Sequence, residues 1–444
     1  MALTGLEIYK LLPRTNCKEC GQPTCLAFAM QLAAGKAALD KCPHVSDAAK
    51  EALGAASAPP IALVKVGAGE RVLEIGNETV LFRHDKRFEH MTGIAVTVPD
   101  NLPPDEIEAR VKAINALCFD RVGQMHSVDL VALENTSKDA AAFAAAVKTA
   151  QANTGLGMIL ISESPEAMAA ALEAIGSAKP LIYAATADNF EKMAALAKQY
   201  DTALAVKAQN LAALEDLVNK VTAAGVKHLV LDTGAREPHQ VLADQTQLRR
   251  QALKRFRPFG FPGIAFATNP DPVQRAVEAG LYVAKYAGIV VLDTADPAEI
   301  LPLITLRLNV YTDPQKPIAV ESKVYEIGAV TPQSPVYITT NFSLTYFCVA
   351  GDVESSRVPG YILPVDTDGI SVLTAWAAGK FTPEKISETL NQSGIAEKVA
   401  HRKMIIPGGV AVLSGKLQEL SGWEVLVGPR ESAGIPAFLK QFWS

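Results

Sequence analysis

The sequence predicts a multidomain α/β protein in three parts: a small helical module, a (β/α)8 TIM barrel, and a doubly wound, Rossmann-like C-terminal domain. Three observations support this division. Four cysteines cluster near the start, a regular strand–helix alternation fills the middle, and a shorter alternation with glycine- and hydroxyl-rich loops follows a proline-containing segment. We expect the module to span residues 1–58, the barrel with an N-terminal hairpin 59–318, and the C-terminal domain 319–444.

The composition is that of an ordinary globular protein. Of 444 residues, 49% are hydrophobic and 20% are charged, and the net charge is −5 without a basic stripe, so we expect no nucleic-acid partner. No stretch approaches about 18 uncharged apolar residues, and the start lacks a signal-peptide pattern, which predicts no membrane association and a cytoplasmic location. Six cysteines here do not make a disulfide framework, and we expect the two isolated ones, Cys118 and Cys348, to be buried.

The four clustered cysteines carry the most specific signal. Cys17, Cys20, Cys25 and Cys42 are spaced C-x2-C-x4-C-x16-C, and Pro43 follows the last of them. Four thiolates are the ligands that one 4Fe–4S cluster needs. Structural zinc sites usually pair two short cysteine knuckles, whereas three cysteines here crowd into one turn-rich segment. The spacing favours a small helical 4Fe–4S module, with tetrahedral zinc and redox-active thiols as the alternatives.

The segments beside these cysteines are expected to be helical. Residues 26–41 predict a helix whose apolar side chains would shield the cluster from water. These side chains are Leu26, Phe28, Ala29, Met30, Leu32 and Ala33. A second short helix would begin after Ser46 as its N-cap. Residues 54–60 (GAASAPP) and 313–323 (DPQKPIAVESK) are linkers by composition, so we expect the cluster module to be able to move.

The middle of the chain alternates between short aliphatic runs and segments rich in Ala, Leu, Glu and Lys. The runs occupy residues 93–98, 128–133, 157–162, 180–185, 202–207, 227–233, 263–268 and 288–294. Near-continuous apolar runs of this length indicate strands that are buried on both faces, as in a parallel sheet. Eight such units match the strand number of a TIM barrel. Residues 61–83 alternate like a hairpin, which we expect to cover the bottom end of the barrel.

Catalytic groups of TIM barrels lie at the C-terminal ends of the strands. The polar residues expected there are Glu134, Asn135, Ser162, Glu163, Asp188, Lys207, Asp232, Thr233, Asn269, Asp293 and Thr294. They include no histidine pair with metal-ligand spacing and no serine–histidine constellation, and several stand where helix N-caps stand. We therefore expect the barrel to be a scaffold or docking surface, with an active site of its own as the alternative.

The last third predicts a small doubly wound sheet. Strands are expected at residues 335–341, 360–367, 403–409 and 423–429, with helices between them. Ligands of such sheets lie beyond the carboxyl ends of the strands. The loops at those ends (TTN, DTDG, PGG and GPRESAG) offer backbone N–H groups and hydroxyls, which suits a ligand edged with amides or a phosphate, although PGG is not a dinucleotide fingerprint. All three tryptophans lie in this third, and we expect them in its core or else against a planar cofactor.

With these features the chain resembles, over essentially its whole length, the large (gamma) subunit of the corrinoid iron–sulfur proteins of the acetyl-CoA (Wood–Ljungdahl) pathway. The likeness is most specific in LLPRTNCKECGQPTCLAFAMQLAAGKAALDKCP and extends to the three-part order. It implies that the four clustered cysteines ligate a 4Fe–4S cluster and that the C-terminal domain binds a corrinoid, a cobalamin-type cobalt cofactor. The matching corrinoid contacts are Thr340, Thr345, Tyr346, Gly369, Ile370, Ser371, Val372, Leu373, Thr374, Gly408, Gly409, Ala433 and Gly434.

The resemblance implies a methyl carrier in anaerobic carbon fixation, with no catalytic side chain of its own. Co(I) would accept a methyl group from methyltetrahydrofolate, held by a separate methyltransferase, and deliver it to acetyl-CoA synthase, while the cluster would return Co(II) to Co(I). Other implied partners are a small subunit, forming a heterodimer, and a reductive activator or ferredoxin. The chain lacks the D-x-H-x-x-G motif whose histidine ligates cobalt, and His401 has no such context, so we expect no protein ligand on the lower face.

Two alternatives remain at this point. An electron-transfer protein without a corrinoid would explain the cysteines but would leave the C-terminal loops without a ligand. A barrel methyltransferase that binds the pterin itself would need convergent amides and carboxylates, which Asn135, Asp188, Asp232 and Asn269 could provide.

Overall fold

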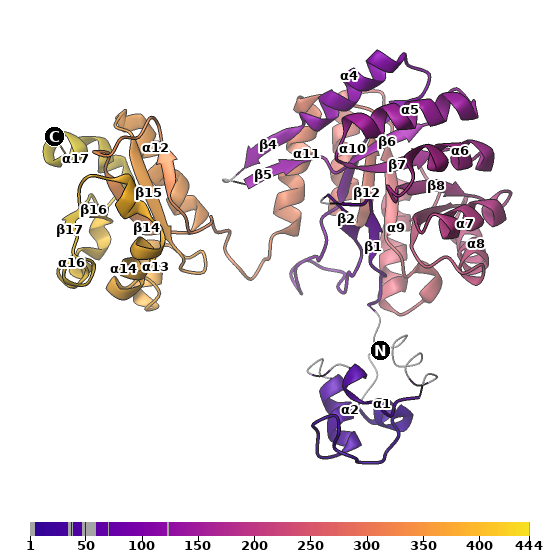
Figure 1. The fold of residues 1–444 in the computed structure, drawn as a ribbon, viewed down its shortest axis with the longest axis horizontal. Coiled ribbons are helices and arrows are strands. Elements are labelled where there is room, and N and C mark those ends of the chain that lie inside the picture. The colour runs from indigo at the N-terminus through magenta and orange to yellow at the C-terminus, as the bar shows by residue number, and fades with distance from the viewer. Residues whose placement is uncertain are drawn as a thin grey trace. The chain divides into compact units, whose positions relative to one another are not determined.

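The computed structural model describes residues 5–33, 37, 39–46, 49, 59–69, 71–121 and 124–443. By their contacts, the chain divides into two compact units: residues 1–119 with 127–311, and residues 120–126 with 312–444, the second here called the C-terminal unit. Figure 1 labels elements of both units. The C-terminal unit is therefore discontinuous in sequence. The three domains expected from the sequence, with boundaries at residues 58 and 318, stay a prediction.

The cysteine segment begins with helix α1 (Gly5–Leu11), followed by α2 (Cys25–Ala33) and a 3-10 turn (Leu39–Lys41). Helix α2 starts at Cys25 because the Thr24 hydroxyl accepts a hydrogen bond from the Ala27 N–H at 3.1 Å, an N-terminal cap. The helix expected between Cys25 and Cys42 is thus present in its first half. The helix expected after Ser46 and most of the 54–60 linker lie outside the described residues.

A closed barrel of eight parallel strands follows and confirms the predicted TIM barrel. Each strand coincides with one of the eight aliphatic runs. The strands are β3 (Gly93–Pro99), β6 (Leu130–Glu134), β7 (Gly157–Ile161), β8 (Leu181–Ala185), β9 (Ala203–Lys207), β10 (Leu229–Asp232), β11 (Gly263–Ala267) and β12 (Ala287–Leu292). The barrel closes between β12 and β3, which pair in parallel.

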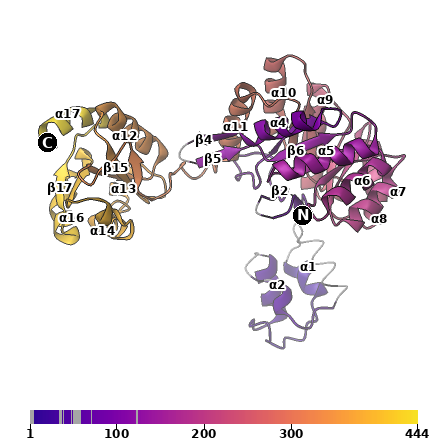
Figure 2. The same ribbon diagram turned by 45° about the horizontal axis from the view of Figure 1, so that its top comes forward.

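Helices surround these strands (Figure 2). They are α4 (Pro104–Asn115), α5 (Ala140–Asn153), α6 (Pro165–Ile175), α7 (Phe190–Gln199), α8 (Leu211–Ala223), α9 (Pro238–Leu253), α10 (Pro272–Ala284) and α11 (Pro297–Tyr311), with a 3-10 turn at Arg257–Phe259. The side chains of Asp139, Ser164 and Asp271 cap α5, α6 and α10, as their sequence contexts predicted. Polar residues after the barrel strands therefore begin helices in these three places.

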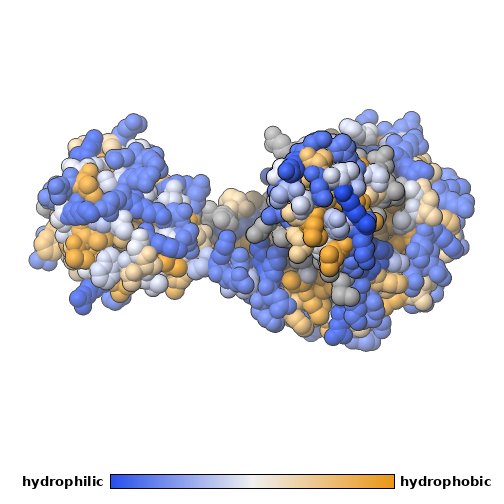
Figure 3. Space-filling view, turned by 90° about the horizontal axis from the view of Figure 1, so that it is seen from below, coloured by the Kyte–Doolittle hydropathy of each residue, from blue (hydrophilic) through white to orange (hydrophobic). Residues whose placement is uncertain are grey.

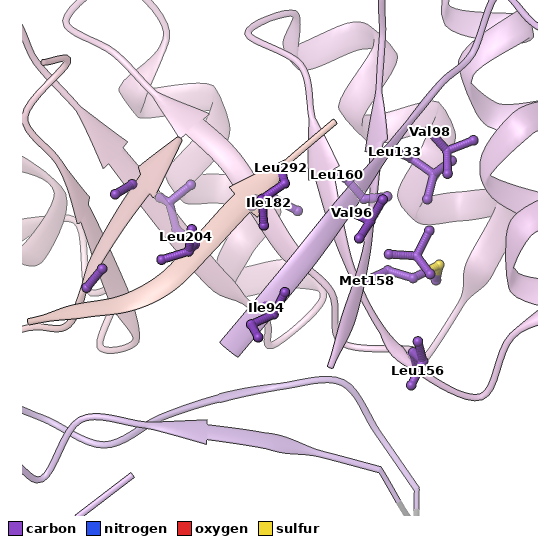
Figure 4. Packing of buried hydrophobic residues seen from close by; sticks show 14 of the residues in the cluster. Ile94, Val96, Val98, Leu133, Leu156, Met158, Leu160, Ile182, Leu204 and Leu292 are labelled. Carbon is purple, nitrogen blue, oxygen red and sulfur yellow. The ribbon is translucent and has the colours of Figure 1, made fainter. Parts of the chain in front are cut away.

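The barrel has two cores because its strands are buried on both faces. Ile94, Val96 and Val98 of β3 pack in the outer core with the helices (Figure 4), whereas Ala95 belongs to the inner core. The hairpin β1 (Val64–Val66) and β2 (Leu73–Ile75) contributes Val64, Val66 and Ile75 to that inner core. Since the Gly67 N–H donates to the Lys179 carbonyl just before β8, the hairpin covers the N-terminal end of the barrel, as predicted.

A second hairpin, β4 (Cys118–Arg121) and β5 (Gln124–Ser127), was not expected from the sequence. This two-stranded ribbon leaves Cys118 exposed, and Cys348 is also exposed, on helix α12 (Ser343–Ser356). The expectation that both cysteines are buried was wrong. An apolar neighbourhood in sequence does not bury a residue where no second layer covers its strand.

The sheet of the C-terminal unit has the strand order β13-β15-β14-β16-β17. Its strands are β13 (Tyr325–Ile327), β14 (Val336–Thr340), β15 (Gly360–Val365), β16 (Lys403–Ile406) and β17 (Glu424–Val427). The last four are parallel, which confirms the doubly wound sheet, and β13 is an additional antiparallel edge strand. Because β15 lies on one side of β14 and β16 on the other, the winding reverses between β14 and β16.

Helices cover both faces of this sheet (Figure 1). They are α12 (Ser343–Ser356), α13 (Val372–Ala377), α14 (Pro383–Gln392), α15 (Ile395–Lys398), α16 (Ser414–Ser421) and α17 (Ile435–Phe442), with 3-10 turns at Gly408–Leu413 and Ser432–Gly434. The first and last of these helices pack on one face, with Tyr337 and Ile405, and the others pack on the opposite face, with Ile338 and Ile406. Across the described residues, no helix has both the length and the apolar character that crossing a lipid bilayer demands.

Candidate functional site

Three of the four clustered cysteines share one small apolar core. Cys25 and Cys42 are buried and Cys20 is half-buried, and all three pack with Phe28. Cys17 is exposed instead, and its sulfur lies within 4.8 Å of the ligand atoms of Glu19 and His44, which are themselves 3.0 Å apart. The predicted ligands thus lie in one region.

The backbone around Cys17 is left-handed at three alternate residues, and one N–H group there donates to a cysteine sulfur. Left-handed conformations recur at Arg14, Asn16 and Lys18, with φ of 58°, 51° and 67°. Alternation of hand along a chain points successive N–H groups to one side and creates a concavity suited to anions, including iron–sulfur clusters. The Asn16 N–H donates to the Cys25 sulfur at 3.4 Å, and the Asn16 side chain accepts the Cys25 N–H at 2.8 Å. Such N–H donors stabilise thiolates and tune the potential of a cluster.

The apolar shield expected along α2 is only partly present. Phe28 and Ala29 are buried and Leu32 is half-buried, but Leu26, Met30 and Ala33 are exposed. The expectation was wrong for the last three because a short helix packed on one side buries only the residues of one face.

A cavity of about 690 Å³ opens at the carboxyl ends of β14 and β16, where the winding of the C-terminal sheet reverses. This is the place where doubly wound sheets bind ligands. Its lining comes from both strands, from the starts of α12, α13 and α17, and from the loops after β16 and β17. The residues are Tyr337, Ile338, Thr339, Phe342, Leu344, Thr345, Cys348, Val349, Ser371, Val372, Leu373, Ile405, Ile406, Pro407, Gly409, Gly428, Pro429, Arg430, Glu431, Ser432 and Ile435.

Two buried hydroxyls in the cavity wall have no partner among the described residues. They belong to Tyr337 and Thr339, which are 3% and 1% exposed. Burial raises the pKa of Tyr337, so its phenol stays neutral and can donate a hydrogen bond. A buried hydroxyl without a partner is costly, so these two atoms suit a ligand that brings hydrogen-bonding groups into the cavity.

The mouth of the cavity is apolar. Leu344 and Leu373 line it and are 63% and 57% exposed, and Phe347 and Trp376, close by in sequence, are also exposed. Apolar side chains at the surface of the C-terminal unit are visible in Figure 3. Trp423 is buried as expected, whereas the exposure of Trp376 fits the alternative of packing against a planar ligand.

The structure brings part of the predicted corrinoid-contact set to this cavity. Thr345, Ser371, Val372, Leu373 and Gly409 line it. Thr340, Ile370, Thr374, Gly408, Ala433 and Gly434 are chain neighbours of lining residues but do not line it themselves. Tyr346 is also next to a lining residue, Thr345, but its side chain is buried against Tyr325, with ring centroids 4.6 Å apart. Gly369 lies further from the lining, and its N–H donates to the Asn341 side chain at 3.0 Å.

Sequence reasoning missed four lining residues that carry chemistry: Tyr337, Thr339, Cys348 and Arg430. Tyr337 lies within an apolar strand run and looks like a core residue, whereas Thr339 belongs to the TTN strand end, which the sequence did single out although Thr339 was not among the predicted contacts. Arg430 stands in the GPRESAG loop, which the sequence did single out, so its charge at a strand end was a usable signal.

The single histidine of residues 312–444 cannot reach this cavity. His401 precedes β16, at the opposite end of the strand, where its Nε2 donates to the Ser334 carbonyl at 3.0 Å and its Nδ1 accepts the Lys403 N–H at 3.2 Å. Both ring nitrogens are occupied, in agreement with the absence of a histidine motif for cobalt.

The polar groups at the barrel's strand ends are largely engaged with one another. Asp232 is buried, accepts the Tyr183 hydroxyl at 2.5 Å and forms a salt bridge with Arg236 at 3.0 Å. The Asn135 amide donates to the Ser162 hydroxyl, and the side chain of Asn269 donates to Glu278. Asp188, the remaining candidate for pterin binding, is exposed. The four do not converge on a common ligand in this arrangement.

Comparisons with known proteins place the chain among its relatives. The family model of the CO dehydrogenase/acetyl-CoA synthase delta subunit matches residues 63–439, and an Fe-S cluster model matches residues 12–44. The corrinoid/iron-sulfur protein large subunit of Moorella thermoacetica is 55% identical over 99% of both chains. The acetyl-CoA decarbonylase/synthase complex subunit gamma of Methanothermobacter thermautotrophicus is 36% identical over 100% of both.

Among solved structures, dihydropteroate synthase from Thermus thermophilus has a TM-score of 0.38 and 17% identity, covering 54% of this chain and 96% of its own. This likeness has no bearing on function. The family model and the two full-length relatives agree over nearly the whole sequence. The chain therefore belongs to the family that comprises the corrinoid/iron-sulfur protein large subunits and the acetyl-CoA decarbonylase/synthase gamma subunits.

Proposed function

We propose that this chain carries a corrinoid and a 4Fe–4S cluster and moves methyl groups from methyltetrahydrofolate, held by a separate methyltransferase, to acetyl-CoA synthase. A bound corrinoid would supply a cobalt nucleophile for the methyl group, and the cluster would supply the electron that restores cobalt after accidental oxidation. The observation that carries the proposal is the cavity at the winding reversal of the C-terminal sheet, with its unpartnered hydroxyls, in a chain that also gathers four cysteines.

The cavity suits a corrinoid in shape and chemistry. A corrin ring is a wide plane with apolar faces and an edge of amide groups. Leu344 and Leu373 offer apolar contact at the mouth, and the hydroxyls of Tyr337 and Thr339 can meet amide groups within. No histidine lines the cavity, so the protein would leave the lower face of cobalt without an imidazole.

In this proposal residues 1–58 form the cluster module, with Cys17, Cys20, Cys25 and Cys42 as ligands, residues 59–318 form the barrel, and residues 319–444 form the corrinoid domain. Partners would be a small subunit, the methyltransferase, acetyl-CoA synthase, and a reductive activator or ferredoxin. Val273 and Val277 are exposed one turn apart on α10 and would give a small subunit an apolar face to pack on. Unpaired cysteines fit a reducing cytoplasm.

The ultraviolet–visible spectrum of anaerobically purified protein, loaded with both cofactors, tests this proposal. Sharp corrinoid bands that change on reduction, above the broad cluster absorption, are expected. Cluster absorption alone in fully loaded protein would leave an electron-transfer protein as the function. A titration with methyltetrahydrofolate tests the remaining rival, because tight binding by this chain alone would favour a barrel methyltransferase.

Replacing Gly409 with valine should weaken corrinoid binding about tenfold or more while leaving the fold intact. A Cβ at Gly409 would lie 3.1 Å from the flexible end of the exposed Leu373 side chain, which can move aside. The methyl groups of the valine would then occupy part of the cavity. Gly415→Val is the matched control, since a Cβ there meets nothing within 4 Å and Gly415 does not line the cavity. Equal affinity of both variants in equilibrium titrations would remove the Gly409 loop from the site.

A further inference from the structure

One cation lines the mouth of the C-terminal cavity. The guanidinium of Arg430 is exposed and forms no side-chain hydrogen bond or salt bridge with any described residue. Arginine side chains at binding sites for carboxylates and phosphates present their N–H groups as a planar fork. A cation without a partner inside the protein is available to an anionic group of a ligand.

The loop that carries Arg430 is held firmly. The Gly428 N–H donates to the Ile406 carbonyl at 2.9 Å, and the Gly408 N–H donates to the Pro429 carbonyl at 3.0 Å. These two bonds extend the pairing of β16 and β17 past the ends of the strands. A Cβ at Gly408 would collide with the Gly428 carbonyl oxygen, so the two loops approach as closely as glycine permits. The position of Arg430 at the cavity mouth is therefore set by the sheet.

Other groups around the same cavity also favour negative charge. Helices α12 and α17 begin at its wall, and Leu344 and Ile435 from their first turns line it. The N-terminal ends of helices carry partial positive charge and free N–H groups. The hydroxyl of Thr339, which is buried in the wall and has no partner among the described residues, adds a further donor. One carboxylate, that of Glu431, lines the cavity as well and limits how much negative charge the mouth can accept.

We propose that Arg430 binds the phosphate group of the ligand and so makes the cavity select corrinoids that carry the phosphate of the nucleotide tail. This inference rests on the proposed function and names the part of the cofactor that the protein recognises. A corrin ring with its amides has no phosphate, whereas the nucleotide tail of a cobalamin-type cofactor is joined through a phosphodiester with a single negative charge. One arginine offset by one glutamate suits such a group better than a more highly charged anion.

Three ligands and three variants test the assignment by equilibrium binding to cluster-loaded, corrinoid-free protein. The ligands are cobinamide, which lacks the phosphate, cobinamide phosphate, and cobalamin. The variants are Arg430→Ala, Arg430→Lys, and Lys440→Ala, which removes an equal charge from an exposed position of α17 that does not line the cavity. Arg430→Ala should weaken cobinamide phosphate and cobalamin about tenfold and leave cobinamide unchanged.

The control variants sharpen this expectation. Arg430→Lys should retain part of the discrimination, because lysine keeps the charge and loses the fork, and Lys440→Ala should bind like the wild type. An equal loss for all three ligands, or no loss for the two phosphate-bearing ones, would overturn the assignment while the corrinoid function stood. A wild-type protein that bound none of the three would overturn the proposed function and this inference with it.

Discussion

Replacing Cys20 with alanine is expected to abolish the recovery of oxidised cobalt while leaving methyl transfer to pre-reduced cobalt near its wild-type rate. Cys20 lies in the same apolar core as Cys25 and Cys42, so its loss would leave the cluster with three thiolates in a partly exposed site. A 4Fe–4S cluster needs four thiolates, so the iron without its cysteine would be open to solvent and to loss. The cavity that we propose for the corrinoid lies in the C-terminal unit and contains none of these residues, so corrinoid binding should not change.

Two assays on the corrinoid-loaded protein separate these effects. Single-turnover methylation after chemical reduction measures the cobalt chemistry, and the yield of active protein after deliberate oxidation and supply of a low-potential electron donor measures repair. Cys118→Ala is the matched control, because Cys118 is exposed on β4 and belongs to no cysteine motif. If Cys20→Ala also lost single-turnover methylation at full corrinoid content, the repair role of the cluster would be wrong.

Replacing Arg249 with methionine should lower the free energy of unfolding of the barrel by about 3 kcal/mol or more. Arg249 is 5% exposed, forms a salt bridge with the equally buried Glu78 at 3.3 Å, and donates to the Val80 carbonyl at 3.1 Å. Its guanidinium also packs over the ring of Tyr286 at 4.8 Å. The variant would leave the Glu78 carboxylate buried without its counter-charge, with the N–H groups of Glu89 and His90 as its remaining donors among the described residues.

Urea unfolding followed by circular dichroism measures this effect, with the barrel and C-terminal unit analysed as separate transitions where they do not coincide. Arg250→Met is the control, since Arg250 is the next residue of α9 and is exposed. A midpoint for Arg249→Met equal to that of Arg250→Met would show that the buried pair contributes little beyond what methionine packing replaces.

The barrel could be predicted strand by strand because each parallel strand is buried on both sides, which leaves an uninterrupted aliphatic run in the sequence. The hairpin β4–β5 and the edge strand β13 give no such signal, because they are short and largely uncovered: Cys118 is exposed on β4, and no residue of β13 is buried. The pattern of apolar residues reflects burial, so it indicates strands only where the tertiary structure covers them.

The cysteine segment and the C-terminal cavity also differed in how well the sequence predicted them. The grouping of the four cysteines was predictable because their spacing along the chain is itself the signal. Part of the cavity wall was not, because Tyr337 lies within an apolar strand run, and only the strand order β15-β14-β16 shows which side chains of that strand line the cavity. That order depends on long-range pairing, which no local pattern of residues encodes.

The discontinuity of the C-terminal unit has a consequence for how the protein is made. Residues 120–126 leave the ribosome long before residues 312–444, with the rest of the barrel synthesised in between. Residues 120–126 are therefore synthesised first and can contact residues 312–444 only near the end of synthesis. This late contact closes a long loop, which has an entropic cost. A fragment that starts at residue 312 lacks that piece, so separate expression of the C-terminal unit calls for a chain in which residues 120–126 are grafted back.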